Sequence, residues 1–347
     1  MEPIHFFPRY SRNGASSRLR IYDYADYLEG AGLATAVHPF FPEEYLTHLY
    51  ATGSKSHGAA IKALLRRLET LRPLPEKAVL EYELLPFLPW EVERFYLKKA
   101  RYLVTFDDDV WEKYRNIPLL RHKYDQLIRN AAGAIAANDI LFERIKKINP
   151  NTIRIPTVVK LGKYAQHPRK FDRFTVVWIG TPVTYSYLEQ AAPQLQAMAK
   201  AVDFELLVIA ETSLRGSAIP GISMRFVDWN ETTEGLLLEQ SHVGIMPLTN
   251  DAFSRGKSAF KLIQYQAAGL PAIASPVGEN KNVIADGING FLANTPAEWA
   301  NALTRLANDR KLYRKLAANA EKRRYDWSFE KYAPVFRDFA VQALQLH

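Results

Sequence analysis

The chain has 347 residues, 48% of them hydrophobic, no cysteine and a formal net charge of +8. This length favours two globular domains, the lack of cysteine excludes disulfides and zinc–thiolate sites, and no stretch approaches the roughly 18 apolar residues of a membrane span. The positive charge favours an anionic partner, which can be a nucleic acid, an anionic membrane surface or a phosphorylated small molecule.

The first half alternates short apolar runs with amphipathic ones, which is the pattern of βαβ units. Its start, Met1-Glu-Pro-Ile-His-Phe-Phe-Pro, has neither the basic nor the long apolar region of an export signal, so we expect a cytoplasmic protein. We predict helices over 16–30 and from the Asn138-Asp139 cap to about Lys147. We predict strands that end at Phe7 and that cover 34–38, 78–80, 102–106 and 133–137.

A small-residue motif, Gly14-Ala-Ser-Ser17, stands at the entry to the first helix. These residues would close on a diphosphate from the opposite domain, so Gly14 and Ser16 are candidate contacts. Arg18 or Arg20 would add positive charge there, although both can equally face solvent.

Three aspartates, Asp107-Asp-Asp109, follow the strand at 102–106. They suit a carboxylate that binds hydroxyl groups of a ligand, with Asp108 or Asp109 as the best candidates, or a helix N-cap. A metal-binding Asp-X-Asp site is disfavoured, because the nucleotide-binding signals come some 150 residues later. The eight histidines also lack metal-ligand spacing, so we predict no metal site.

The basic residues form short, dispersed clusters, and no aromatic-studded recognition module accompanies them, so nucleic acid is the least supported partner. Arg66-Arg67 and Lys98-Lys-Ala-Arg101 suit contact with an anionic bilayer or a solvated helix face.

A polar linker, 161–173, follows the first half, and we place the interdomain hinge there. We predict an N-terminal domain over 1–165 and a C-terminal domain over 166–327. A last helix begins near Ser328 and carries an apolar stripe, and residues 328–347 would pack back onto the first domain.

The second half contains five short apolar strands, which are typical of a doubly wound parallel sheet. They cover 174–179, 204–209, 224–227, 243–246 and 272–274. Ligands of such sheets bind beyond the carboxyl ends of the strands. We therefore expect the site in the loops at 180–185, 228–230, 247–258 and 275–281.

The most informative segment runs from Arg255 to Ser275 and predicts a loop, a helix over about 259–268, a tight turn and a buried strand. Ser258 is the expected N-cap and Gly269 the left-handed residue after the helix. Two cations beside a helix N-terminus favour a diphosphate ligand, although a solvated lysine stripe is the alternative. The binding candidates in this segment are Arg255, Lys257, Ser258, Lys261 and Gln264.

Two further loops supply candidates. Gly180 and Thr181 follow an apolar strand and would bring backbone and hydroxyl groups to a phosphate. The alternative is that the glycine serves only to form a turn. Glu279 and Asn280 follow a turn, where Glu279 either contacts a ligand or is a surface turn residue.

Four motifs from Trp178 to Leu292 resemble, in order and spacing, the C-terminal domain of family 4 glycosyltransferases. They are Trp178-Ile-Gly-Thr-Pro182, the segment from Arg255 to Ser275, Ser275-Pro-Val-Gly-Glu-Asn280 and Ile284-Ala-Asp-Gly-Ile-Asn-Gly-Phe-Leu292. The first half is similar through Gly14 to Arg20 and Thr105 to Trp111. The resemblance implies a GT-B fold, with two Rossmann-like α/β domains facing a cleft and the C-terminal helix crossing back to the first.

The resemblance also exposes departures. The family usually has two glutamates eight residues apart where this chain has Gly256 and Gln264, so the ribose contact is in doubt. An arginine and a lysine after the first glycine loop are also missing, which leaves Lys257 and Lys261 as the main cations.

The resemblance implies a retaining hexosyltransferase that moves a sugar from a UDP or GDP sugar to a hydroxyl acceptor without a metal or other cofactor. Lys257, Asp108, Asp109 and Glu279 are then the catalytic candidates, and the acceptor is a saccharide or a lipid-linked molecule of cell-surface polysaccharide or glycolipid synthesis. The resemblance also implies that the protein contacts the inner face of the membrane peripherally. A sugar nucleotide epimerase, a catalytically degenerate scaffold and a basic membrane-surface protein are the alternatives.

Overall fold

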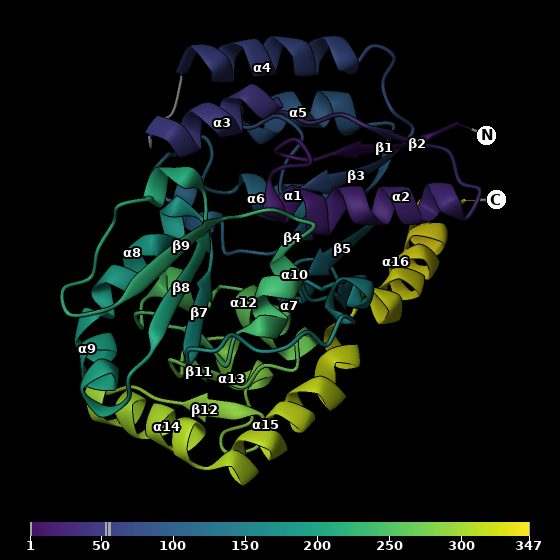
Figure 1. The fold of residues 1–347 in the computed structure, drawn as a ribbon. Helices are drawn as coiled ribbons and strands as arrows, with labels where there is room; N and C mark the ends of the chain where they lie inside the picture. The colour runs from purple at the N-terminus through teal and green to yellow at the C-terminus, as the bar shows by residue number, and fades with distance from the viewer. Residues whose placement is uncertain (1, 53, 55–56, 347) are drawn as a thin grey trace. The chain divides into compact units, whose positions relative to one another are not determined.

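The computed structural model describes residues 2–52, 54 and 57–346 and divides the chain into two compact units. The first unit holds the chain up to Thr157 and again from Tyr332 onward, and the second runs from Val158 to Lys331. Each unit contains a six-stranded parallel sheet with helices packed against it (Figure 1). No helix in the described part of the chain combines the length and the apolarity needed to cross a bilayer.

The sheet of the first unit has the order β2-β1-β3-β4-β5-β6, and all its pairings are parallel. Its strands are β1 (Ile4–Phe7), β2 (Thr35–Val37), β3 (Lys77–Glu81), β4 (Arg101–Phe106), β5 (Gly133–Ala136) and β6 (Thr152–Arg154). Its helices are α1 (Ala15–Ser17), the π-helical turn η1 (Arg18–Tyr22), α2 (Asp23–Gly30), α3 (Glu43–Thr52), α4 (His57–Thr70), α5 (Trp90–Leu97), η2 (Trp111–Lys113), α6 (Lys123–Asn130), α7 (Asp139–Lys146) and α16 (Phe329–Leu344).

The sheet of the second unit has the order β12-β11-β10-β7-β8-β9 and is also parallel throughout. Its strands are β7 (Thr175–Ile179), β8 (Glu205–Ala210), β9 (Met224–Asp228), β10 (Val243–Met246), β11 (Ala272–Ala274) and β12 (Gly290–Leu292). Its helices are η3 (Leu161–Tyr164), α8 (Pro182–Gln190), α9 (Ala192–Ala201), η4 (Thr212–Leu214), α10 (Glu234–Gln240), α11 (Ala252–Arg255), α12 (Phe260–Ala267), α13 (Asn280–Val283), α14 (Pro296–Asn308), α15 (Arg310–Arg323) and η5 (Arg324–Trp327).

The predicted architecture of two doubly wound parallel sheets is confirmed. Central strands are buried on both faces, as in β7, and this explains their uninterrupted apolar sequence. Asn138 caps α7 as predicted, since its side chain accepts from the Leu141 N–H at 2.9 Å. The short strands β6 and β12 were not predicted, because three residues carry too little periodicity to be recognised.

Residues 161–173, predicted as a linker, make ordered contacts within the second unit. Tyr164 is buried in its core, and the Lys170 ammonium donates to the Ser241 carbonyl at 2.7 Å. This segment therefore packs on the second unit, although its polar composition is typical of a linker.

Each sheet has one point where the strand order reverses. In the first unit the chain leaves β1 toward β2 on one side and continues at β3 on the other. In the second unit β7 is followed by β8 and β9 on one side, and β10 to β12 lie on the other side. The carboxyl ends of β1 and β3, and those of β7 and β10, are therefore the expected ligand positions.

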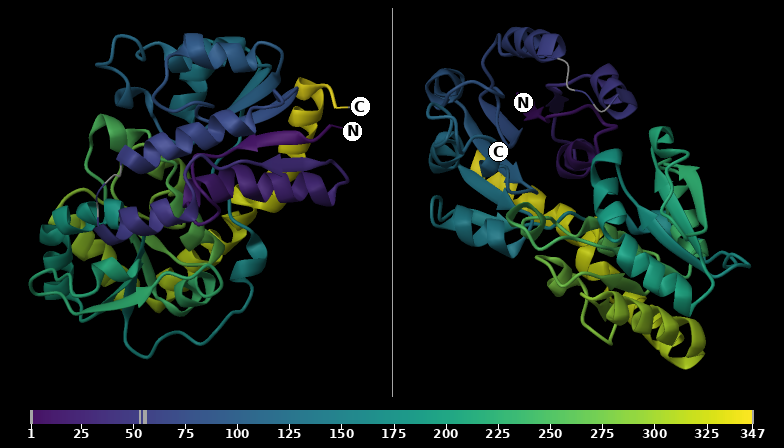
Figure 2. Two further views of the ribbon diagram at one scale, coloured as in Figure 1. Left: turned by 90° about the horizontal axis from the view of Figure 1, so that it is seen from above. Right: turned by 90° about the vertical axis from the view of Figure 1, so that its left-hand side faces the viewer.

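The C-terminal helix α16 packs on the first unit, as predicted. Its Phe336 ring lies 4.4 Å from the Tyr24 ring of α2, and the Arg101 guanidinium donates to the Ala343 carbonyl. A Cβ on Gly133 of β5 would come within 2.6 Å of the Phe339 ring, so glycine is needed for this close approach. Figure 2 shows α16, in yellow, beside α2, in purple.

Removal of the Phe336 ring tests this packing. Phe336 is 1% exposed, so Phe336→Ala leaves a cavity and should destabilise the protein by about 3–5 kcal/mol. Its neighbour Val335 is 43% exposed, so Val335→Ala should change stability much less. Urea unfolding of both variants gives the two values, and equal losses would contradict the packing described here.

Candidate functional site

In the second unit, the loops after β7 and β10 meet at the strand-order reversal. A Cβ on Gly180 would come within 2.5 Å of the Trp178 ring and 2.8 Å of the Thr184 hydroxyl, so only glycine lets the backbone turn here. Thr181 precedes α8, and its N–H donates to the Thr184 hydroxyl at 3.1 Å. The predicted glycine loop is thus a tight, capped entry to a helix.

Both predicted lysines lie over aromatic rings at this end of the sheet. The Lys261 ammonium is 5.1 Å from the centre of the Trp178 ring, the same ring that lies against Gly180. The Lys257 ammonium lies 5.3 Å from the Tyr187 ring of α8 and 4.5 Å from that of Phe253. The structure therefore brings the glycine loop and the lysine segment together around α8 and β7.

The helix after Lys257 begins one residue later than predicted. Its N-cap is Ala259, which has a left-handed φ of 54°, and the expected Ser258 cap is therefore wrong. The reason is that α11 ends at Arg255, so the chain must reverse sharply before α12 can start. Gly269 has the predicted left-handed φ of 61° after the helix.

The turn at 276–280 packs directly on the lysine segment. Gly278 has a φ of 51°, and a Cβ there would lie 2.4 Å from the Arg255 carbonyl oxygen. The exposed Arg255 side chain donates to the Asn250 side chain at 2.9 Å. Glu279 is 4% exposed, so it is not a surface residue, and the Asn280 amide donates to the Ser275 carbonyl at 3.0 Å.

Gln264 lies in a buried polar cluster that the sequence did not indicate. Its amide nitrogen is 3.4 Å from Glu234 Oε2, and the Trp229 indole N–H donates to the same oxygen at 2.7 Å. Lys163 lies 3.9 Å from Glu234 and 2.7 Å from Glu231. No local motif marks Glu234, which became apparent only through its contacts.

In the first unit, polar side chains gather at the carboxyl ends of β1, β3 and β4. The Ser16 hydroxyl lies 2.8 Å from Glu81 Oε1 and 2.6 Å from Asp107 Oδ2. Burial is the main cause that raises the pKa of Glu81, and the nearby charge of Asp107 is the second. Ser16, predicted as a phosphate contact, thus has its hydroxyl engaged by two carboxyl groups in this structure.

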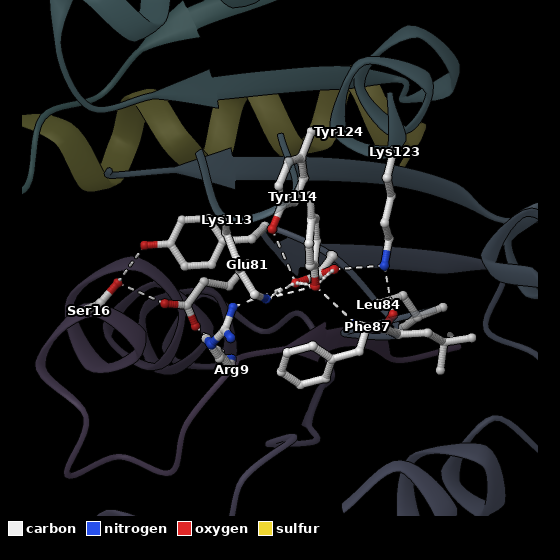
Figure 3. Close-up of polar contacts among 12 residues, drawn as sticks. Arg9, Ser16, Glu81, Leu84, Phe87, Lys113, Tyr114, Lys123 and Tyr124 are labelled. Atoms are coloured by element: carbon white, nitrogen blue, oxygen red, sulfur yellow. Dashed lines mark hydrogen bonds and ion pairs between the residues drawn. The ribbon is translucent and has the colours of Figure 1, made fainter. Parts of the chain in front are cut away.

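Glu83 is the centre of a buried ionic cluster. Figure 3 shows four other members of this cluster, Lys113, Tyr114, Lys123 and Tyr124. It accepts hydrogen bonds from the ammonium groups of Lys123, at 2.7 Å, and Lys113, at 3.0 Å, and from the Tyr114 hydroxyl. Burial by itself would raise the pKa of Glu83, but Lys123, Lys113 and Arg9 outweigh it and lower that pKa to about 2. Glu83 therefore stays ionised although it is shielded from water.

Sequence reasoning missed both carboxylates that end β3. Glu81 and Glu83 are separated by Tyr82, which has a φ of 64°, and the Glu83 N–H donates to the Glu81 carbonyl. A γ-turn of this kind is rare for a bulky residue. The only available signal was a Glu-Tyr-Glu sequence directly after a buried strand.

The two predicted aspartates follow Asp107 after the end of β4. Asp109 accepts from the Trp111 N–H at 3.3 Å and lies 3.4 Å from the Arg144 guanidinium, but the N-cap of the η2 turn is Val110, so Asp109 is not a helix cap. Asp108 is half-buried and also has interaction partners. Asp107, which was not singled out, is 7% exposed and accepts from the Ser16 and Tyr82 hydroxyls.

The arginines after Gly14 do not face solvent. Arg18 is 4% exposed and Arg20 is 2% exposed. Arg20 donates to the Thr105 hydroxyl at 2.6 Å and to the Ile155 carbonyl at 2.6 Å, so it ties the first helix to β4 and to the end of β6. Gly14 is required because a Cβ would lie 2.6 Å from that of Tyr10.

The candidates therefore form two sets. Gly14, Ser16, Asp108 and Asp109 belong to the first unit, and the remaining candidates belong to the second. Within residues 2–52, 54 and 57–346, no group of three or more histidine or acidic side chains is arranged to hold a metal ion.

Removal of the Lys123 ammonium tests the ionic cluster. Lys123 also lies 2.9 Å from Glu93, so Lys123→Met leaves two buried carboxylates without this partner and should cost about 3–5 kcal/mol of stability. Arg115→Met removes an exposed pair with Glu112 and is the matched control, for which a much smaller loss is expected. Comparable losses in chemical denaturation would contradict this description.

Comparisons with known proteins agree with the fold. Residues 173–309 match the sequence model of the family described as glycosyl transferases group 1. A glycosyltransferase from Rickettsia africae has a TM-score of 0.68 at 13% identity, with 100% of both chains covered. Sucrose-phosphate synthase from Thermosynechococcus elongatus has a TM-score of 0.70 at 15% identity, over 99% of this chain and 100% of that one.

The Anabaena protein HepE in complex with UDP has a TM-score of 0.66 at 12% identity, over 99% of this chain and 100% of that one. No curated protein matches the sequence. These solved structures share the fold at low identity, and the family match contains Gly180, Lys257 and Lys261. The chain thus has the GT-B fold of these glycosyltransferase structures, and its residues 173–309 are similar to glycosyl transferases group 1.

Proposed function

We propose that the protein is a retaining glycosyltransferase that moves a sugar from a nucleoside diphosphate sugar to a hydroxyl acceptor without a metal ion. The observation that carries this proposal is the meeting of the Gly180 loop with Lys257 and Lys261 at the strand-order reversal of the second sheet. These residues lie inside the segment that matches glycosyl transferases group 1.

The chemistry requires positive charge at the leaving group. The bond between the anomeric carbon and the phosphate oxygen breaks, the acceptor oxygen bonds to that carbon, and the acceptor proton passes to the departing phosphate. Lys257, Lys261 and the N-terminal N–H groups of α12 are suited to stabilise the negative charge that develops on the diphosphate. This assignment needs neither a metal nor a covalent protein intermediate.

The other candidates take positioning roles in this proposal. Gly180 and Thr181 are proposed to hold the phosphates from the β7 side, Gln264 to bind a ribose hydroxyl, and the buried Glu279 to orient the transferred sugar. Asp108 and Asp109 belong to the acceptor domain. Arg255, Ser258 and Asn280 complete the set of proposed donor contacts in the second unit.

UDP-glucose is the first donor to assay, because HepE has been crystallised with UDP-glucose and has the same fold. GDP sugars form the second series. A saccharide or lipid-linked acceptor at the cytoplasmic face of the membrane, in polysaccharide or glycolipid synthesis, is the proposed setting.

Removal of one ammonium group tests the mechanism. Lys257→Ala should lower kcat by roughly 10²–10³-fold while the fold is retained, because the charge acts on the transition state. Lys311→Ala removes an exposed lysine on α15, outside the candidate loops, and should leave kcat near that of the wild type. Transfer from radiolabelled donor is measured, with circular dichroism as the folding control.

Two outcomes would contradict this proposal. A folded Lys257→Ala variant with wild-type turnover would remove Lys257 from the mechanism. Calorimetry that detects no binding of UDP or GDP by the wild type would favour a scaffold with the same fold.

The proposed membrane contact has a specific candidate surface on α4. Ile61 and Leu65 are 62% and 56% exposed, and the exposed Lys62 and Arg66 lie beside them on the same helix face. An exposed apolar pair flanked by basic residues suits the interface of an anionic bilayer.

Replacement of the exposed apolar pair by glutamate tests the membrane contact. The double variant Ile61→Glu and Leu65→Glu should lose binding to vesicles that contain anionic lipid, because burial of two carboxylates in the interface is unfavourable. Val183→Glu changes a residue that is 71% exposed in the second unit and should bind as the wild type does. Equal vesicle co-sedimentation of the three proteins would exclude α4 as the contact.

A further inference from the structure

The Ser16 hydroxyl lies between two carboxyl groups but has a single hydrogen. It is 2.8 Å from Glu81 Oε1 and 2.6 Å from Asp107 Oδ2, and both distances are those of hydrogen bonds. The hydroxyl hydrogen can serve one of these contacts only. The other contact needs a proton on a carboxyl group, because two oxygens without a hydrogen between them repel each other.

The remaining carboxyl oxygens have their own donors. Glu81 Oε2 accepts from the Ser17 hydroxyl at 2.5 Å and from the Arg9 N–H at 2.7 Å. Asp107 Oδ1 accepts from the Tyr82 hydroxyl. The extra proton therefore belongs on Glu81 Oε1 or on Asp107 Oδ2, the two atoms that face Ser16.

We propose that Glu81 carries this proton in the folded protein and donates it to Ser16, whose own hydrogen is donated to Asp107. Glu81 is the deeper group, 2% exposed against 7% for Asp107, so loss of hydration disfavours its charged form more strongly. Asp107 then keeps the single negative charge of the pair.

The electrostatic surroundings agree with this assignment. Burial and the charge of Asp107 both raise the pKa of Glu81, and the bonds from Ser17, Arg9 and Ser16 oppose them with smaller effect. The Arg9 guanidinium is directed to Glu83, at 3.6 Å, and supplies no direct ion pair to Glu81. The titratable and charged groups that face the pair are Arg9, Tyr22, Tyr82 and Asp108.

This inference deepens the proposed function and rests on it only for its role in catalysis. In the proposed transferase, Glu81 and Ser16 are positioning residues that hold the Asp107 carboxylate charged and fixed, and Asp107 in turn fixes the backbone that carries its neighbour Asp108, the proposed acceptor contact. The location of the proton itself can be measured whether or not the protein transfers sugar.

Infrared spectroscopy locates the proton. At neutral pH the wild type should show the C=O stretch of a protonated carboxyl group, and this band should shift when glutamate carboxyl groups are labelled with ¹³C. It should be absent in Glu81→Gln. A band that shifts only with labelled aspartate would place the proton on Asp107, and the absence of any such band would show that both groups are ionised; either result overturns the proposal.

The pH dependence of stability gives an independent measurement. A raised pKa in the folded state stabilises the protein below the ordinary glutamate value of 4.5, and this contribution is lost as the pH rises through the folded pKa. Above pH 4.5 the unfolding constant of the wild type should rise relative to that of Glu81→Gln, by up to tenfold per pH unit. A ratio that stays constant with pH would contradict the shared proton.

Measurement of kcat distinguishes a positioning role of Glu81 from a purely structural one. Gln at position 81 keeps a donor toward Ser16 and an acceptor toward Ser17, whereas Ala keeps neither. Glu81→Ala should therefore lower kcat, Glu81→Gln should restore most of it, and Asp107→Asn should lower kcat by tenfold or more. Equal losses in Glu81→Ala and Glu81→Gln would remove the positioning role, while the infrared result would still decide where the proton lies.

Discussion

The reversal of strand order in each parallel sheet is the constraint on which both candidate regions depend. The carboxyl ends of parallel strands all lie at one edge of the sheet. Where two adjacent strands continue into loops that run in opposite directions, a crevice forms at that edge and polar groups can line it. In the second unit this position lies between β7 and β10, and in the first it lies between β1 and β3. The two polar regions thus follow from topology.

The second unit illustrates how such an edge acquires positive charge without burying it. The Lys257 and Lys261 ammonium groups lie over aromatic faces, which attract cations without neutralising them. Glycines at 180 and 278 keep the surrounding backbone close, since a Cβ at either position would overlap Trp178 or Arg255.

The first unit differs from the second, because several charged side chains are buried at the carboxyl edge of its sheet. Glu83 stays ionised since two ammonium groups and two tyrosine hydroxyls replace the water that it loses. Glu81 has only neutral donors and a neighbouring carboxyl group, so the same burial favours its neutral form. Two glutamates two residues apart therefore differ in charge because their partners differ.

The amino-acid sequence by itself determined ten of the twelve strands in the described residues, the helices α2, α7, α12 and α16, the Gly269 turn and the position of the lysine segment, because these depend on local periodicity and on backbone preferences. It also placed the glycine loop and the lysines at the same edge, through the rule that governs parallel sheets. Only the tertiary structure decided that Glu81, Glu83 and Glu234 have buried polar roles, that Ser258 is not the cap and that Asp107 is buried whereas Asp108 and Asp109 are half-buried. The physical reason is that burial and charge depend on partners distant in the sequence, such as Ser16 for Asp107 and Lys123 for Glu83, which no local pattern specifies.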